Sequence, residues 1–268
     1  MSQSQPFDHV AQDYDATFTE TQTGKLQRQQ VYKNLSQILQ DTDIQDVLEI
    51  NCGTGVDAAW MARNGKTVLA TDISSEMVSV AQMKAKRLPV EVQQRLDFEC
   101  QSITDLDLDR SYDLVFSNFG GLNCLSPEEL KTFLAKSSSL VRPGGWLVLV
   151  IMGRFCWWET LYFSLKGQFA TAWRRISRTP SIARLEDNSS IPTWYYSPSD
   201  ILRNLEPYTS PVIRPIGFFT PPSYLEPFFQ KRPRLLGMLD RLESVVNGWS
   251  WAAWGSDHYY LAVKRGEN

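Results

Sequence analysis

The sequence predicts an α/β fold built on a doubly wound, mostly parallel seven-stranded β-sheet whose last strand is antiparallel. Short apolar runs, typical of strands buried on both faces, alternate with helical patterns over the first 152 residues. One such run, residues 47–50, leads directly into Gly53 and Gly55 and then into a helix, as in a strand-to-helix turn that binds a ligand. Two more strand patterns follow, separated by aromatic-rich additions that predict a helical lid.

Two kinds of signal mark the elements of the first part. Ser74 and the pair Ser126-Pro127 are typical of residues that begin a helix. Apolar runs bounded by polar or glycine-containing turns indicate the strands. The strands are expected at residues 47–50, 67–72, 96–100, 112–117 and 146–151, and the helices at 25–39, 57–63, 75–84 and 127–136.

The composition is that of an ordinary globular protein. The chain has 268 residues, 43% hydrophobic and 21% charged, which suits one large domain or one domain with a sizeable insertion. Its net charge is -3, but residues 154–234 carry 11 Lys and Arg against 6 Asp and Glu. The four cysteines show no paired spacing, and the N-terminus lacks the pattern of a secretory signal. We therefore expect a cytoplasmic protein with reduced thiols and no metal site.

The glycine turn fits two classes of ligand. Residues 53–58 satisfy the loose dinucleotide pattern, and Asp72 follows at the spacing of a ribose-binding acid, so an NAD(P)-dependent oxidoreductase is one reading. Glu49 and Asn51 argue against it, because a carboxylate beside the turn would repel a diphosphate. A ligand that carries an amino group and a sulfonium cation would favour those side chains.

The order Glu49-x-Asn51-x-Gly53-x-Gly55 resembles the first motif of class I S-adenosylmethionine-dependent methyltransferases, which have a Rossmann-like fold. Asn51 stands where that family commonly has glycine, and asparagine adopts left-handed conformations at little cost. The opening at residues 7–15 and the Arg-Pro-Gly-Gly turn at 142–145 also resemble the family. The resemblance covers residues 7–151 well and the terminal strands weakly.

This resemblance implies S-adenosylmethionine as cofactor and S-adenosylhomocysteine as product. Asp72 would accept hydrogen bonds from the ribose hydroxyls, while Tyr14 would lie near the sulfonium and Arg28 near the carboxylate. Gln101 stands where the family usually has an adenine-binding acid. The complete cofactor set is expected to be Tyr14, Arg28, Glu49, Asn51, Gly53, Gly55, Asp72, Ile73, Met77, Gln101, Ser102, Ile103 and Asn118.

The resemblance also divides the chain into segments. We expect cap helices at residues 1–45, the Rossmann-like core at 46–152, a helical aromatic and basic insertion at 153–196, and the remaining core at 197–268 with a second helical insertion near 221–255. The insertions suit a lid over an apolar acceptor, a membrane-facing patch, a nucleic-acid platform or simply an extra helical layer. Among the functional readings we favour the lid, since a closed site keeps water from the reactive methyl group.

The acceptor is expected to be small and hydrophobic or lipid-like, methylated on oxygen or carbon. The loop after residue 117 lacks the two prolines common in enzymes that methylate planar amino groups of DNA bases or glutamine. Acceptor contacts are expected from Phe119, Asn123, Trp157, Trp158 and Tyr195. If a base is required, the candidates are His9, Glu159, Tyr195 and His258, none of them singled out by the sequence.

Three alternatives stay open beside this reading: the NAD(P)-dependent oxidoreductase, a tRNA-modifying methyltransferase, and a non-catalytic cofactor-binding protein. No run of like charges is long enough to favour nucleic acid as a partner. Peripheral membrane contact through the insertions is compatible with their aromatic and basic residues. A monomer and a homodimer are equally compatible with the sequence.

Overall fold

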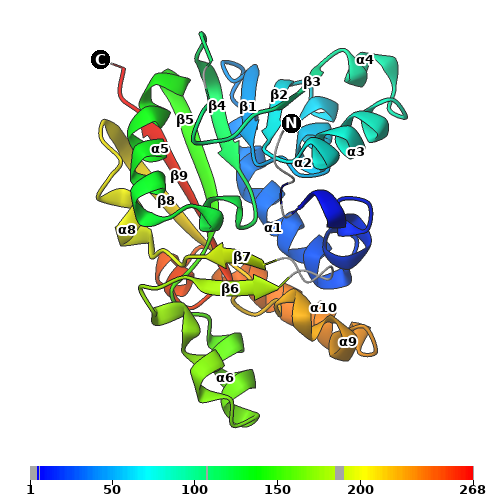
Figure 1. The fold of residues 1–268 in the computed structure, drawn as a ribbon, viewed down its shortest axis with the longest axis vertical. Coiled ribbons are helices and arrows are strands. Elements are labelled where there is room, and N and C mark those ends of the chain that lie inside the picture. The colour runs from blue at the N-terminus through cyan, green and yellow to red at the C-terminus, as the bar shows by residue number, and fades with distance from the viewer. Residues whose placement is uncertain (1–4, 6, 107, 185–189, 268) are drawn as a thin grey trace.

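A seven-stranded sheet forms the centre of the computed structural model, which describes residues 5, 7–106, 108–184 and 190–267 (Figure 1). The spatial order of its strands is β3-β2-β1-β4-β5-β9-β8. All neighbours from β3 to β5 are parallel, and β9 is antiparallel to both β5 and β8. The strands are β1 (Asp46–Ile50), β2 (Thr67–Asp72), β3 (Leu96–Cys100), β4 (Tyr112–Ser117), β5 (Val141–Met152), β8 (Tyr208–Ile216) and β9 (His258–Arg265). This arrangement confirms the predicted fold class, including the antiparallel last strand.

Helices cover both faces of the sheet. The α-helices are α1 (Gln22–Leu39), α2 (Val56–Arg63), α3 (Ser75–Ala85), α4 (Val90–Gln93), α5 (Pro127–Leu140), α6 (Trp157–Leu165), α7 (Phe169–Ala172), α8 (Pro198–Leu202), α9 (Glu226–Phe229) and α10 (Pro233–Val246). Shorter turns are η1 (Asp8–Val10), η2 (Asp15–Thr19), η3 (Gly121–Cys124), η4 (Arg174–Ile176), η5 (Ser223–Leu225) and η6 (Ser250–Trp254). None of the helices in the described part of the chain has both the length and the apolar composition needed to span a membrane.

Alternate residues of the central strands enter two separate cores. On β5, Leu147 and Leu149 pack with α5 and α8, whereas Val148 and Val150 pack with α1, α2 and α3. This alternation explains why the strands read as continuous apolar runs, since neither of their faces meets water. The two cores hold the carboxyl ends of the parallel strands in fixed register.

Several element boundaries differ from those expected: β5 begins at Val141 and not at residue 146, and α5 extends to Leu140 and not only to residue 136. Helix α1 begins three residues early, because the side chain of Thr21 accepts a hydrogen bond from the Gly24 amide and Glu226 accepts from the amides of Gln22 and Thr23. Strand β8 spans Tyr208–Ile216, whereas the apolar pattern of residues 212–219 predicts a strand there; it ends at Ile216 because Gly217 turns the chain with a left-handed φ of +76°. The start of α1 therefore depends on Glu226, which is distant in sequence, and the end of β8 depends on a glycine turn.

The first insertion is not entirely helical. Beside α6, α7 and η4 it contains a two-stranded antiparallel sheet of β6 (Ser181–Arg184) and β7 (Ser190–Thr193), and residues 185–189 lie outside the described part. Both insertions pack together through aromatic rings, including Trp158 on Phe229 and Tyr162 on Tyr224. Figure 1 shows β6 and β7 between the large sheet and α6.

Candidate cofactor and acceptor site

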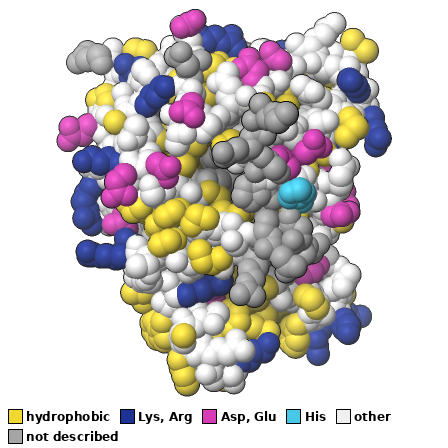
Figure 2. All heavy atoms as spheres, in the orientation of Figure 1, with side chains coloured by type: hydrophobic (Ala, Val, Ile, Leu, Met, Phe, Trp, Pro, Cys, Tyr) yellow, Lys and Arg dark blue, Asp and Glu magenta, His cyan; other side chains and the backbone are white. Residues whose placement is uncertain are grey.

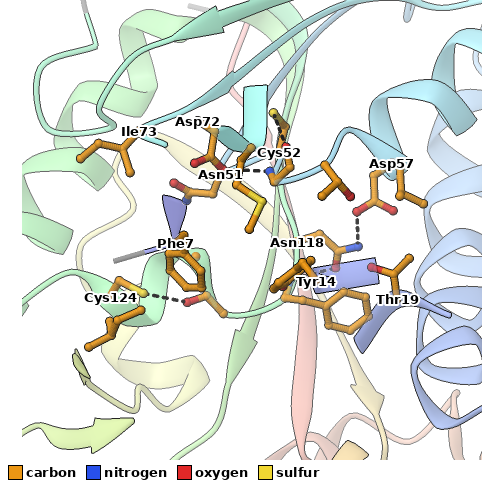
Figure 3. Close-up of a pocket in the computed structure, with 18 of the residues that line it drawn as sticks. Phe7, Tyr14, Thr19, Asn51, Cys52, Asp57, Asp72, Ile73, Asn118 and Cys124 are labelled. Atoms are coloured by element: carbon orange, nitrogen blue, oxygen red, sulfur yellow. Dashed lines mark hydrogen bonds between the residues drawn. The ribbon is translucent and has the colours of Figure 1, made fainter. Parts of the chain in front are cut away.

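The carboxyl ends of β1, β2 and β4 meet at one edge of the sheet. Ile50 is paired with Thr71 on one side and with Ser117 on the other, so the residues after these strands converge. This edge is the switch point in strand order, where open α/β sheets bind ligands. Asn51, Asp72 and Asn118 all face the cavity found there (Figure 3).

The cavity has a volume of about 260 Å³. Its wall is mainly apolar or uncharged, and its charged members are Arg28, Asp57 and Asp72. The lining residues are Phe7, Tyr14, Thr19, Arg28, Asn51, Cys52, Gly53, Thr54, Val56, Asp57, Asp72, Ile73, Met77, Asn118, Phe119, Gly120, Gly121, Cys124, Met152, Ala183, Ile191 and Thr193. Eight of the predicted cofactor residues are among them: Tyr14, Arg28, Asn51, Gly53, Asp72, Ile73, Met77 and Asn118.

The backbone of the glycine turn explains its sequence. Gly53 and Gly55 have left-handed φ values of +53° and +74°, and a Cβ on Gly55 would lie 2.8 Å from the Cβ of Ala81. Gly53 has no atom within 4 Å of its ideal Cβ position, so this side of the turn is open to a ligand. Asn51 also has a left-handed φ, +57°, which confirms the expected conformation at this departure from the family motif.

Asp72 is held in place by two backbone amides. One carboxylate oxygen accepts from Gly53 at 2.8 Å and the other from Ser74 at 2.9 Å. Burial raises the pKa of Asp72 above its usual value, although these amides partly offset that effect. Each oxygen keeps a second lone pair, so the carboxylate can accept hydroxyl hydrogen bonds in addition.

Asp57, in the first turn of α2, is the centre of a buried polar cluster. Its carboxylate accepts from the Arg28 guanidinium, from the Tyr32 hydroxyl at 2.6 Å and from the Asn118 amide at 2.9 Å. A helix N-terminus is normally free to bind an anion, but here a carboxylate already occupies its first turn. Nothing in the sequence pattern singled out Asp57, because one acid in a helix N-terminal turn is common.

Glu49 lies beneath this cluster and does not line the cavity. The side chain is 1% exposed, and its Oε2 has no hydrogen-bond partner among the described residues. Burial, and next the charge of Asp57, raise the pKa of Glu49 well above its usual value. The Nε of Arg28 is also buried without a partner. The cluster thus offers one unused donor and one unused acceptor close to the cavity.

Phe119 lies between the cavity and the body of the protein. Its ring contacts the Arg28 guanidinium at 5.1 Å and the His258 ring at 5.2 Å, and its own φ is +38°. A bulky residue with positive φ is strained and is commonly found at functional sites. Tyr14 closes the cavity from the cap, and burial raises its pKa to about 12, which keeps the phenol neutral.

The predicted adenine contacts on β3 are not brought to the cavity. Gln101 donates from its amide nitrogen to Glu99, Ser102 bonds to Thr104, and Ile103 is buried in the core beside α5. Gly55 faces Ala81 and Phe98, on the far side of the turn. The cavity instead receives Ile73 and Met77 from the loop after β2 and from α3.

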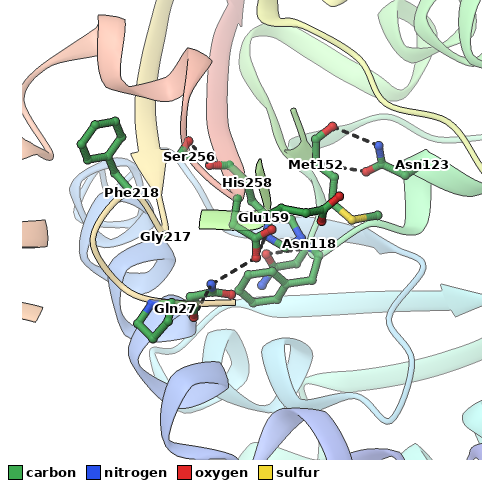
Figure 4. A network of polar contacts seen from close by, with 12 residues as sticks. Gln27, Asn118, Asn123, Met152, Glu159, Gly217, Phe218, Ser256 and His258 are labelled. Atoms are coloured by element: carbon green, nitrogen blue, oxygen red, sulfur yellow. Dashed lines mark hydrogen bonds and ion pairs between the residues drawn. The ribbon is translucent and has the colours of Figure 1, made fainter. Parts of the chain in front are cut away.

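Three predicted acceptor residues have structural contacts away from the cavity. Asn123 is fully buried, and its side chain bonds the backbone of Met152 and of Trp194, which joins η3, β5 and the first insertion (Figure 4). The indole nitrogens of Trp157 and Trp158 donate to the carbonyls of Phe218 and Phe219. These bonds join the first insertion to the loop that follows β8. Of the predicted acceptor set, which also included Tyr195, only Phe119 lines the cavity.

The candidate bases lie outside the cavity as well. Glu159 is buried in ion pairs with Arg174 and Arg175, and Tyr195 packs under the Arg175 guanidinium at 5.1 Å. His258 is buried behind Phe119, with Nδ1 3.3 Å from Asp257. His9 is exposed on η1. None of these four lines the cavity within the described part of the chain.

The hairpin β6–β7 supplies wall residues that the sequence did not reveal. Ala183, Ile191 and Thr193 line the cavity opposite the glycine turn. A four-residue strand of mixed polarity has no clear periodicity, so only the tertiary structure identifies these side chains.

Comparisons with known proteins agree with this geometry. Residues 47–145 match the family model described as a methyltransferase domain. A ubiquinone biosynthesis O-methyltransferase of Xanthomonas campestris is 32% identical over 113 residues, which are 40% of this chain and 43% of the relative. A demethylmenaquinone methyltransferase of Tropheryma whipplei is 30% identical over 147 residues, 53% of this chain and 56% of the relative. The chain therefore spans about half the length of these curated relatives.

Solved structures resemble most of the chain. A complex of DhpI with SAH has a TM-score of 0.60 at 18% identity and covers 98% of this chain and 94% of its own. A SAM-dependent methyltransferase from Methanosarcina mazei has a TM-score of 0.54 at 16% identity and covers 84% of this chain and 94% of its own. These likenesses show the fold, which is that of class I S-adenosylmethionine-dependent methyltransferases.

Proposed function

We propose, on the premise that residues 47–145 are a methyltransferase domain, that the chain transfers the methyl group of S-adenosylmethionine to oxygen or carbon of a small hydrophobic acceptor. Asp57 is the observation that carries the choice of cofactor. Asp57 lies in the first turn of α2, so its negative charge would repel a dinucleotide diphosphate placed at that helix N-terminus. This placement argues against the nicotinamide-dependent alternative.

The residues of the cavity fit S-adenosylmethionine. Asp72 keeps free lone pairs for ribose hydroxyls, and Ile73 and Met77 provide apolar contact for adenine. The unused Arg28 Nε and Glu49 Oε2 match the carboxylate and ammonium of an amino acid end. When bound, the cofactor supplies an electrophilic methyl group.

The protein's own contribution is alignment and exclusion of water. Tyr14 and Phe7 cover the cavity from the cap, and the β6–β7 hairpin covers it from the other side. A site lined in this way would hold the acceptor atom in line with the methyl group and limit the access of water.

The cavity wall also bears on the acceptor. Burial raises the pKa of Cys124 to about 11, that of Cys52 also rises, and no imidazole lines the described wall. An acceptor that ionises readily, such as a phenol or an enol, needs no strong base. Phe119, Met152 and Ile191 would hold its apolar part. The quinone-related names of the two relatives are compatible with such an acceptor.

Calorimetric titration with S-adenosylhomocysteine tests the cofactor. We expect micromolar binding by the wild type, and a loss of about 1.5–3 kcal/mol in Asp72→Ala, because charged hydrogen bonds are removed. The exposed Asp43→Ala is the matched control and should bind like the wild type. Thermal unfolding without ligand shows whether each variant is folded.

Titration with NADH separates the alternatives. Binding of NADH and not of S-adenosylhomocysteine would refute the methyltransferase proposal. If S-adenosylhomocysteine binds but a panel of phenols and enols gives no methylated product, the cofactor assignment stands and the acceptor class is wrong.

A further inference from the structure

The two insertions together form one end of the molecule that is unusually apolar on its outside. Leu165 on α6 is 80% exposed, and Phe169, Trp173, Trp249 and Trp251 are also exposed at this end. Figure 2 shows hydrophobic side chains at the lower end of the molecule with Lys and Arg among them. Exposed apolar surface of this extent normally marks a binding surface.

Helix α10 shows that the exposure is organised. Leu236 and Val246 are buried against the body, whereas Met238, Leu242 and Val245 form a second, exposed apolar stripe at helical spacing. Helix folding needs only the first stripe. The second is available for a partner that accepts apolar side chains.

The acidic residues of the second insertion all turn inward. Glu226 accepts from the amides that begin α1, and Asp240 accepts from Gln30. Glu243 accepts from the amides of residues 217–220. Each carboxylate is thus used to join the insertion to the body of the protein.

The basic residues of the same segment turn outward. Lys231, Arg232, Arg234 and Arg241 are exposed, and none of them forms an ion pair with a described residue. Arg234 and Arg241 lie one turn before Met238 and Val245, on the same side of α10. The outer surface is therefore both apolar and cationic, although the whole chain has a net charge of -3.

We propose that this end of the molecule, formed by α6, α7, η4, α9, α10 and η6, binds peripherally to an anionic lipid surface. Aromatic and aliphatic side chains would enter the region below the headgroups, and the cations would contact lipid phosphates. Tryptophan is well suited to such an interface because its ring is apolar and its N–H is polar. The proposal concerns a surface distinct from the cofactor site and does not depend on methyl transfer.

Two other occupants fit this surface less well. A second copy of the chain would bring its own uncompensated cations against these, which opposes a self-complementary interface. Nucleic acid would use the cations and aromatic rings but not the aliphatic stripe of Met238, Leu242 and Val245. A lipid surface uses all three kinds of side chain.

The surface also adjoins the route into the cavity. On β6, Ala183 lines the cavity, and the neighbouring Ile182 is 59% exposed. The hairpin lies between the large sheet and α6 (Figure 1). Docking at this end would place one wall of the cavity near the bilayer, where a hydrophobic acceptor is dissolved.

Vesicle flotation without cofactor or acceptor tests the proposal. We expect the wild type to float with vesicles of equal parts phosphatidylcholine and phosphatidylglycerol, and far less with phosphatidylcholine alone. Met238→Ser with Val245→Ser should lower partitioning about tenfold or more, and Arg234→Gln with Arg241→Gln should do the same. All four residues are exposed, so these variants should remain folded.

A matched pair on another face provides the control. Met83 and Val90 are 44% and 63% exposed, close to the 52% and 62% of Met238 and Val245. Met83→Ser with Val90→Ser should float like the wild type. Failure of the wild type to bind anionic vesicles would overturn the proposal, as would equal losses in the control.

Two further outcomes would assign the surface to another partner and so overturn the proposal. One is a dimer in size-exclusion chromatography that Met238→Ser with Val245→Ser dissociates. The other is salt-sensitive binding of RNA that Arg234→Gln with Arg241→Gln abolishes while the wild type ignores vesicles.

Discussion

At the scale of single residues, the site is defined by how three carboxylates are compensated. Asp57 is satisfied by Arg28, Tyr32 and Asn118, and Asp72 is satisfied in part by backbone amides. Glu49 is buried with an unpartnered oxygen and a raised pKa. A bound cation would therefore stabilise the ionised form of Glu49 more than that of Asp57 or Asp72.

Replacement of Glu49 by Gln is therefore expected to stabilise the ligand-free protein. The folded state holds the Glu49 proton above pH 4.5, the ordinary pKa, whereas the unfolded state releases it, so wild-type stability falls as pH rises from there. Glu49→Gln has no such proton to release, so its free energy of unfolding should exceed that of the wild type by about 1–3 kcal/mol at pH 8 and by less at pH 5. Urea denaturation at both pH values measures it.

The exposed Glu91→Gln provides the comparison and should change the stability by less than about 0.5 kcal/mol. A Glu49→Gln protein less stable than the wild type at pH 8 would show that the carboxylate is ionised and paired in the folded state. Weaker binding of S-adenosylhomocysteine by the same variant would link Glu49 to the cofactor ammonium.

Sequence reasoning found the residues of the site whose role follows from position on a strand. Gly53 and Asp72 lie at strand ends, where the parallel-sheet pattern alone brings them to the cavity. It did not find Asp57, whose significance depends on Tyr32 and Arg28 from α1. It also expected Trp157 and Trp158 at the acceptor, because aromatic content does not reveal the direction of a side chain.

At the scale of elements, α10 is joined to the sheet by one buried acid. The Glu243 carboxylate accepts four backbone amides, from Gly217 at 2.9 Å to Thr220 at 2.9 Å, in the loop that follows β8. These amides have no strand partner after Gly217 ends the strand. One side chain therefore fixes both the loop and the helix.

Glu243→Gln should destabilise the protein by about 2–4 kcal/mol, because an amide replaces one charged acceptor with a donor that faces backbone N–H groups. Asp240→Asn on the same helix keeps its acceptor for Gln30 and should lose less than about 1 kcal/mol. Chemical denaturation of both variants gives the two values. If both lose the same amount, the four amides do not depend on the charge of Glu243.

The predicted elements were most accurate where local signals dominate. Ser126 and Pro127 begin α5, as expected, and Ser197 and Pro198 begin α8 with the same capping pattern. The β6–β7 hairpin was missed, because its two short strands are stabilised by each other and by the cavity wall.

At the scale of the whole molecule, a buried ion network joins the first insertion to the sheet. Arg175 on η4 contacts both Glu159 of α6 and Asp257, the residue before β9. Burial alone would raise the pKa of Asp257, but the charges of His258 and Arg175 hold it below its ordinary value of 3.8. We therefore expect the first insertion to unfold in one cooperative transition with the core.

Arg175→Met tests this unity, because it leaves Asp257 without its guanidinium and weakens the compensation of Glu159. We expect the free energy of unfolding to fall by about 3–5 kcal/mol at pH 7, as for other buried ion pairs that lose one partner. The neighbouring Arg174 is 37% exposed, so Arg174→Met should lose less than about 1 kcal/mol. The loss in Arg175→Met should shrink below about pH 4, where the stabilisation by ionised Asp257 fades.

Two probes separate the insertions from the core in this experiment. Seven of the nine tryptophans lie in residues 153–196 and 221–255, so fluorescence reports mainly on the insertions, whereas far-ultraviolet circular dichroism reports on the whole fold. If the network couples the insertions to the core, the unfolding midpoints measured by fluorescence and by circular dichroism fall by the same amount in Arg175→Met. A fluorescence midpoint that falls while the dichroism midpoint stays would show that the insertions unfold separately. The lipid-binding end would then be a module attached to a core that is stable without it.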